Sequence, residues 1–160
     1  MGSSLPPALE MGSSKSAYLA PDVIPREGPA HVLLGNYGTA TSSIQTPSPL
    51  NYLAIRLNAG ERWRYQPPVG HTVLWTAIAT GSVLVPDELQ QGELVAFTPS
   101  NEAVEFEATS DAEFVLGSAV PHDHHLVLGS HSVHTSVEAL QEADERISEI
   151  RTRLIQQGRF

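Results

Sequence analysis

Short runs of β-forming residues, separated by clusters of turn residues, recur from His31 to Leu116. They follow one another at about the 8 to 12 residue spacing that is typical of sandwiches and barrels. Twelve glycines and twelve prolines break the chain between and around the runs, and these residues favour turns over long helices. The pattern therefore predicts an all-β core. The runs span residues 31–34, 51–58, 71–79, 82–85, 94–98, 104–108 and 113–116.

Three of these runs show how the strands are arranged. Leu53, Ile55 and Leu57 alternate with more polar residues, which is the period of a half-buried strand. Apolar and acidic residues alternate over 104–107 in the same way, which is typical of an antiparallel sheet with one solvent-exposed face. The run 71–79 is followed closely by 82–85, and we expect these two to pair as a hairpin.

The last segment changes period and predicts a helix over about 136–157. Its apolar residues recur at steps of three and four, which draws one stripe along a helix. Thr135 and Glu138 fit a capping box at the start, and Gly158 fits the end. The stripe consists of Leu140, Ala143, Ile147, Ile150 and Leu154.

The chain has the length of about one domain, since its 160 residues suffice for one sizeable core but not two. Residues 1–29 are rich in Ser, Pro, Ala and Gly, and we expect an extended arm or linker there. The core is expected over 30–135. The helix, with residues 136–160, is expected to pack on it.

Composition excludes several classes of function. Eighteen acidic residues against nine basic ones give a net charge of -9, which disfavours nucleic acid and anionic membranes as partners. Cysteine is absent, so disulfides, thiolate metal sites and a cysteine nucleophile are excluded. No run reaches the roughly 20 apolar residues of a membrane span, and the first residues lack a signal-peptide pattern. A cytoplasmic protein is expected.

Several short segments, taken in order, resemble the C-terminal half of the pirin family, a branch of the cupin superfamily. The resemblance runs from about Val32 to Phe160 and implies a single cupin (RmlC-like jelly-roll) β-barrel with one C-terminal α-helix. In pirins the N-terminal barrel binds a metal, usually iron, through three His and one Glu, and some members have quercetin 2,3-dioxygenase activity. The segments are 33–38, 53–60, 91–94, 126–129, 132–135 and 158–160.

The two cupin motifs test whether that metal site is carried over. Counting from Gly60, the two histidine positions of the first motif fall on Gln66 and Pro68, and no glutamate follows before the closing glycine. Counting from Gly92, the histidine position of the second motif falls on Val95. Since cupin metals need imidazole and carboxylate ligands, we expect no cofactor at the usual site.

A histidine-rich stretch offers a displaced metal site. His122, His124 and His125 lie close together, and neutral imidazole is a common ligand of Fe, Ni, Cu or Zn. The alternative is that these side chains are solvated in a loop, because a proline and a glycine bracket the stretch.

Aromatic residues offer a second candidate site. Trp63, Tyr65 and Trp75 lie on strands around the usual cupin cavity, and ligand pockets in barrels are mostly apolar with a few polar groups. The alternative is that they only fill the core. If a pocket exists, its polar contacts are expected from Arg62 or Arg64, whichever faces inward, and from His71.

Two functions follow from these patterns. The first is a cupin domain without the usual metal, which binds a small molecule or associates as a homodimer or with another cupin domain. The alternative is a metal-dependent, dioxygenase-like cupin that uses the displaced histidines. The first is favoured, because the chain has no phosphate loop, nucleophile elbow or other catalytic constellation.

Overall fold

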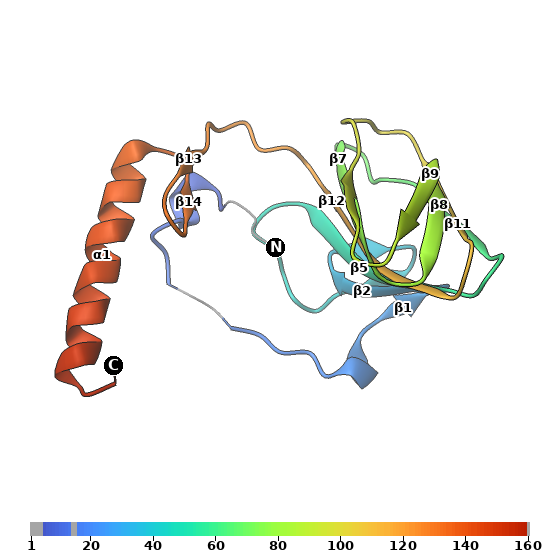
Figure 1. The fold of residues 1–160 in the computed structure, drawn as a ribbon. Coiled ribbons are helices and arrows are strands. Elements are labelled where there is room, and N and C mark those ends of the chain that lie inside the picture. Colours follow the sequence, from blue (N-terminus) through green and yellow to red (C-terminus); the bar gives the residue numbers. More distant parts are fainter. Residues whose placement is uncertain (1–4, 14–15, 160) are drawn as a thin grey trace. The chain divides into compact units, whose positions relative to one another are not determined.

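The structure is a computed structural model that describes residues 5–13 and 16–159, and its contacts divide the chain into two units (Figure 1). We call Ala17–Pro121 the sandwich unit. The terminal unit combines the described residues before Ala17 with His122 onward. No helix in the described residues is long and apolar enough to cross a membrane.

The larger sheet of the sandwich unit has six antiparallel strands in the order β1-β2-β5-β12-β7-β10. At its centre β5 pairs with β12 over eight residues, with Asn51 opposite Ser118 and Ile55 opposite Phe114. Because side chains alternate along a strand, both of these pairs point to the same face. The strands are β1 (Arg26–Glu27), β2 (Ala30–Leu34), β5 (Leu50–Leu57), β12 (Ala112–Ala119), β7 (Val73–Thr80) and β10 (Leu94–Ala96).

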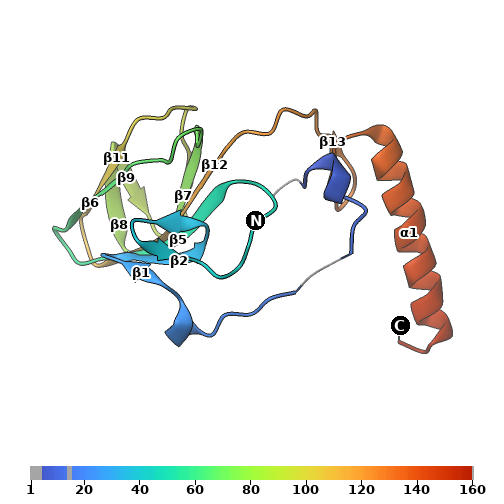
Figure 2. The same ribbon diagram turned by 180° about the vertical axis from the view of Figure 1, so that it is seen from behind.

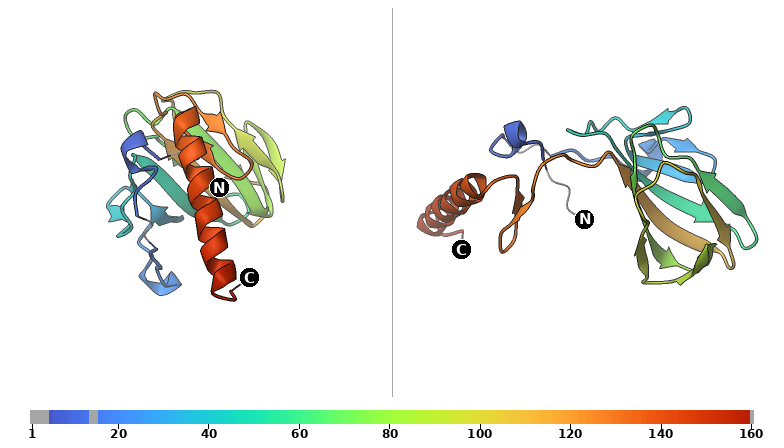
Figure 3. Two further views of the ribbon diagram at one scale, coloured as in Figure 1. Left: turned by 90° about the vertical axis from the view of Figure 1, so that its left-hand side faces the viewer. Right: turned by 90° about the horizontal axis from the view of Figure 1, so that it is seen from above.

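The smaller sheet has four strands in the order β6-β11-β8-β9 and is seen best in Figure 2. The two sheets are separate ladders that form two layers (Figure 3), so the predicted all-β core is confirmed and forms an open sandwich rather than a closed barrel. A small hairpin lies beside them. The strands are β6 (Arg62–Tyr65), β11 (Val104–Ala108), β8 (Ser82–Val85) and β9 (Asp87–Gln90), and the hairpin is β3 (Asn36–Tyr37) with β4 (Ala40–Thr41).

Aromatic side chains fill the space between the sheets. Phe106 stacks on Phe114 with ring centroids 5.1 Å apart, and Trp63 lies 5.6 Å from Phe106. All three are buried. The period-2 prediction for β5 is confirmed, since Leu53, Ile55 and Leu57 are at most 5% exposed.

The predicted hairpin between residues 71–79 and 82–85 is wrong. Strand β7 pairs with β12 and β10, whereas β8 pairs with β9 and β11 in the other sheet. The chain changes sheets at Gly81, whose φ of 72° is left-handed and whose Cα packs so closely on Asp111 that a side chain would overlap its carbonyl. The turn after β8 instead leads into β9, which the sequence did not predict because 87–90 has no β-branched residue.

The terminal unit contains the predicted helix, α1 (Val137–Gln156), beside a hairpin of β13 (Val127–Leu128) and β14 (Val133–His134). The predicted cap is one residue off: Ser136, not Thr135, accepts the N–H of Ala139 at 3.0 Å. The predicted end is confirmed, because Gly158 has a φ of 65° and donates to the carbonyl of Ile155.

Part of the expected N-terminal arm belongs to the terminal unit. Glu10 follows the 3-10 turn η1 (Pro7–Leu9), and its carboxylate accepts the N–H of Thr135 at 2.9 Å. The same carboxylate lies 3.3 Å from Nδ1 of His134, and these hydrogen bonds hold the pKa of Glu10 below its usual value. A second turn, η2 (Pro21–Val23), precedes β1, so regular structure begins before the expected boundary at residue 30.

The expected packing of the helix on the barrel stays a prediction.

Candidate functional site

Strand β6 carries four of the predicted pocket residues, which alternate between exposed and buried along the strand. Trp63 and Tyr65 are buried, whereas Arg62 and Arg64 are exposed. The aromatic pair therefore points between the sheets and the arginines point away, as period-2 alternation requires.

A pocket of about 410 Å³ opens where the end of β6 meets the β3–β4 hairpin. This volume lies within the usual range of small-molecule sites. We call it the β6 pocket. It is lined by Glu27, Asn36, Tyr37, Gly38, Asn51, Arg64, Tyr65, Gln66 and Pro68.

The floor of the β6 pocket is held by a buried chain of hydrogen bonds. Asn51 accepts the N–H of Asn36 through Oδ1 at 2.9 Å and donates through Nδ2 to the Tyr65 hydroxyl at 3.1 Å. That hydroxyl lies 2.7 Å from Oγ of Ser118, which in turn lies 2.9 Å from Nδ1 of His71. Burial raises the pKa of Tyr65, so its phenol stays neutral. Such a satisfied network is rigid.

His71 belongs to this network behind the floor and does not line the pocket itself. Its side chain is buried, and this burial lowers the pKa of the imidazole below its usual value of 6.5. The folded protein therefore favours neutral His71.

This lowered pKa predicts a loss of stability in mild acid. The unfolded chain takes up a proton at His71 as the pH falls through 6.5, while the folded chain resists it until a lower pH. The free energy of unfolding should thus be level above this range and fall below it. Urea unfolding of the wild type and of His71→Gln, at about pH 7.5 and about pH 5.5, measures the effect. The variant should lose less stability between the two values; an equal loss in both proteins would contradict the assignment.

Arg64 supplies an unpaired charge at the edge of the pocket. Arg62, two residues earlier, is 2.8 Å from Glu107, and Arg56 is 3.0 Å from Glu113. Among the described residues the guanidinium of Arg64 forms no such ion pair and no hydrogen bond, although Glu105 lies opposite Arg64 on β11. The pocket's carboxylate, Glu27, is already engaged by the hydroxyl and N–H of Thr39, which lower its pKa.

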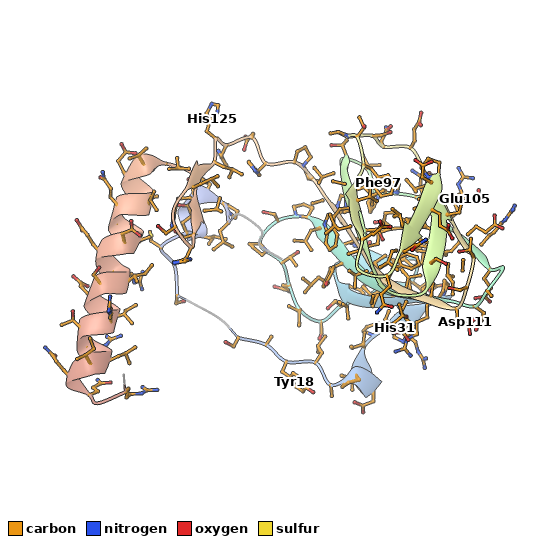
Figure 4. The ribbon with its side chains drawn as sticks, in the orientation of Figure 1. Tyr18, His31, Phe97, Glu105, Asp111 and His125 are labelled. Carbon is orange, nitrogen blue, oxygen red and sulfur yellow. The ribbon has the colours of Figure 1, made fainter. Side chains whose placement is uncertain are left out.

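The other predicted pocket residues, Trp63, Trp75 and Arg62, do not line the β6 pocket. Trp63 is buried behind the pocket and donates from its indole N–H to the hydroxyl of Tyr37 at 2.9 Å. Trp75 points to the other face of β7, where it covers Gly117 and lies 5.9 Å from Tyr52. Arg62 lines a second pocket of about 520 Å³. Two further residues of its lining, Phe97 and Glu105, are labelled in Figure 4. Of the predicted set, the β6 pocket brings together Arg64 and Tyr65.

Among the residues that sequence reasoning missed, three build the β6 pocket or its floor. Tyr37 comes from the small hairpin, and Asn51 and Ser118 come from the two central strands. A signal was present: Asn51 and Ser118 are polar residues at inward positions of otherwise apolar strands. Such residues need buried partners.

The predicted metal ligands His122, His124 and His125 lie in the terminal unit and are exposed. Nε2 of His124 is 3.0 Å from its neighbour Asp123, and His125 projects from the loop in Figure 4. No three His, Asp or Glu residues within 5–13 and 16–159 are grouped as metal ligands. Metal binding by these histidines stays a prediction.

No family model and no curated protein matches the sequence. Among solved structures, quercetin 2,3-dioxygenase from Acinetobacter baumannii is 23% identical with a TM-score of 0.68, over 75% of this chain and 42% of that one. GK1651 from Geobacillus kaustophilus is 20% identical with a TM-score of 0.67, over 76% and 53%. Pirin YhhW from Escherichia coli, in complex with nickel(II), is 18% identical with a TM-score of 0.45, over 50% and 34%.

The chain has the cupin fold. The resemblance expected from the sequence is confirmed only as one of fold, by quercetin 2,3-dioxygenase and GK1651, and the chain spans less than two thirds of the length of each.

At the two cupin motif positions the chain carries neither an imidazole nor a carboxylate. Of the two motif positions, Gln66 is exposed and Pro68 is half-buried. The residue at the end of β6 that points inward is Tyr65. The only imidazole in the network is His71, and its other members are two hydroxyls and an amide. Iron, nickel or copper sites use several imidazole or carboxylate ligands.

Proposed function

We propose that this cupin domain binds a small organic carboxylate in the β6 pocket and does so without a metal. One observation carries the proposal: the guanidinium of Arg64 has no partner among the described residues, at the edge of a pocket whose floor is held in place by hydrogen bonds. A rigid floor lowers the cost of ordering the site when a ligand binds.

The lining groups favour a ligand with an acidic end and a flat apolar body. Arg64 can form two parallel hydrogen bonds to a carboxylate. The ring of Tyr37 and the side chain of Pro68 offer apolar surface. Asn51 uses one N–H of its amide for Tyr65 and keeps a second donor for the ligand.

The proposal includes no catalytic step. Ser118 and His71 are within hydrogen-bond distance, but both are buried and Ser118 also contacts the Tyr65 hydroxyl. We infer that the pair supports the pocket floor. A dioxygenase-like activity at His122, His124 and His125 has no observation in its favour beyond their spacing, and a cytoplasmic location stays a prediction.

Titration with benzoate, followed by the amide resonances of the protein, tests the site. Arg64→Gln should weaken binding about tenfold to 100-fold, because a hydrogen bond to a charged group contributes about 1.5 to 3 kcal/mol. Arg62→Gln is the matched control, since Arg62 lies on the same strand but is paired with Glu107 outside the β6 pocket. Its Kd should equal that of the wild type. Equal binding by both variants would refute the role of Arg64.

A further inference from the structure

The terminal unit encloses the carboxylate of Glu10. The side chain of Glu10 is 5% exposed, and that of His134, whose Nδ1 lies 3.3 Å away, is 10% exposed. Acidic side chains are rarely buried to this degree unless they are paired. Two donors meet the carboxylate: the N–H of Thr135 at 2.9 Å and Nδ1 of His134. We call this place, between β14 and α1, the junction site.

The donors of the junction site favour the charged form of a carboxyl group. A carboxylate only accepts hydrogen bonds, so Nδ1 of His134 carries the hydrogen that lies between the two groups. The hydrogen bonds from Thr135 and His134 lower the pKa of Glu10, which is therefore ionised in the site at neutral pH. Hydrogen bonds to an ionised acceptor are roughly twice as strong as those between neutral groups.

The segment that carries Glu10, residues 5–13, has few other contacts with the terminal unit. We call this segment the strap. Its residues other than Glu10 are half-buried or exposed, and Leu9 is 47% exposed. Arg146 on α1 adds one exposed hydrogen bond, to the carbonyl of Met11 at 3.0 Å. Because the strap buries little apolar surface, it gains little from the hydrophobic effect. Its docking therefore depends on the seated carboxylate.

The imidazole of His134 opposes the docked state. Its Nε2 is buried and has no hydrogen-bond partner among residues 5–13 and 16–159. With the hydrogen on Nδ1, this nitrogen is an acceptor without a donor, and a buried group in that state costs free energy. Contact with water would remove this cost, so solvation of His134 favours an open junction site.

We propose that the junction site is a binding site for carboxylates, which the chain closes with Glu10 as a tethered ligand. A tethered group has a high effective concentration, so a free carboxylate does not displace Glu10 in the wild type. The site accepts a carboxylate from outside the chain when the strap leaves it. Other residues line the β6 pocket, and this inference does not depend on that pocket.

Addition of acetate to Glu10→Ala tests the site, because acetate supplies the carboxylate that this substitution removes. Hydrogen exchange, followed by nuclear magnetic resonance, measures the protection of the Thr135 amide. The exchange should be about tenfold to 100-fold faster in Glu10→Ala than in the wild type, since a hydrogen bond to a charged group is lost. Saturating acetate should restore most of this protection, whereas sodium chloride at the same ionic strength should not. The amide resonance of Arg64 reports separately on acetate in the β6 pocket.

Glu10→Gln and Glu61→Ala are the matched controls. The glutamine side chain fills the junction site, so acetate has no room to bind. The carboxylate of Glu61 also accepts a backbone N–H, that of Asn58 at 2.7 Å, but in an exposed place. Acetate should therefore not protect Asn58 in Glu61→Ala.

Recovery by acetate also decides the outcome if Glu10→Ala loosens its surroundings. The amides of β14 and α1 should then regain protection together with that of Thr135. Protection that stays lost in acetate, equal recovery in chloride, or the same response in Glu10→Gln would each overturn the proposal.

Discussion

Gly35→Ala should lower the free energy of unfolding by about 2 to 5 kcal/mol and abolish ligand binding in the β6 pocket. Gly35 has a left-handed φ of 78°, which costs an alanine energy by itself. A side chain there would also overlap Oδ1 of Asn51 and the carbonyl of Leu50. Asn51 would have to move, and the pocket floor with it.

Gly60→Ala is the matched control. Gly60 has a similar φ of 81°, but a side chain there would meet nothing within 4 Å. It should cost only the backbone term of about 1 to 2 kcal/mol and leave binding unchanged. Urea unfolding and the benzoate titration measure both effects. Equal losses of stability in the two variants would show that the close approach of Gly35 to Asn51 does not contribute to the free energy of unfolding.

Ser118→Ala should cost about 1 to 3 kcal/mol of stability, because it leaves Nδ1 of the buried His71 without a partner and the Tyr65 hydroxyl with Asn51 alone. Its hydroxyl bridges the Tyr65 phenol at 2.7 Å and the His71 imidazole at 2.9 Å, and all three residues are at most 5% exposed. Binding in the β6 pocket should weaken as well, since Tyr65 forms its floor.

Ser82→Ala serves as the control for this change. The Ser82 hydroxyl also contacts two side chains, Thr109 at 2.6 Å and Ser110 at 3.3 Å, but close to solvent. Water can replace these bonds, so the loss should stay below about 1 kcal/mol. Chemical unfolding compares the two variants, and a similar small loss in both would mean that the network around Ser118 does not stabilise the fold.

The fold was largely predictable because the strands and the helix follow local periods. The alternation of Leu53, Ile55 and Leu57 and the stripe of α1 depend only on neighbours in the chain. Pairing between strands depends on distant residues. The sequence placed a hairpin across Gly81, but the approach of Asp111, thirty residues later, turns the chain into the other sheet.

The site was predictable only in part for the same reason. Alternation on β6 separates Trp63 and Tyr65 from the arginines, yet one strand alone does not show which set faces inward. The two arginines differ only in their tertiary contacts, since Arg62 is paired with Glu107 and the guanidinium of Arg64 is not paired. Asn51 and Ser118 are adjacent across β5 and β12, a pairing that no local pattern encodes.

Titration of the wild type with benzoate, before and after dialysis against EDTA, decides whether this cupin domain binds a carboxylate without a metal. We expect shifts of the amide resonances centred on Arg64, Tyr65 and Gln66, with the same Kd in both samples. Binding that disappears after EDTA, or shifts centred on His122–His125 instead, would contradict it.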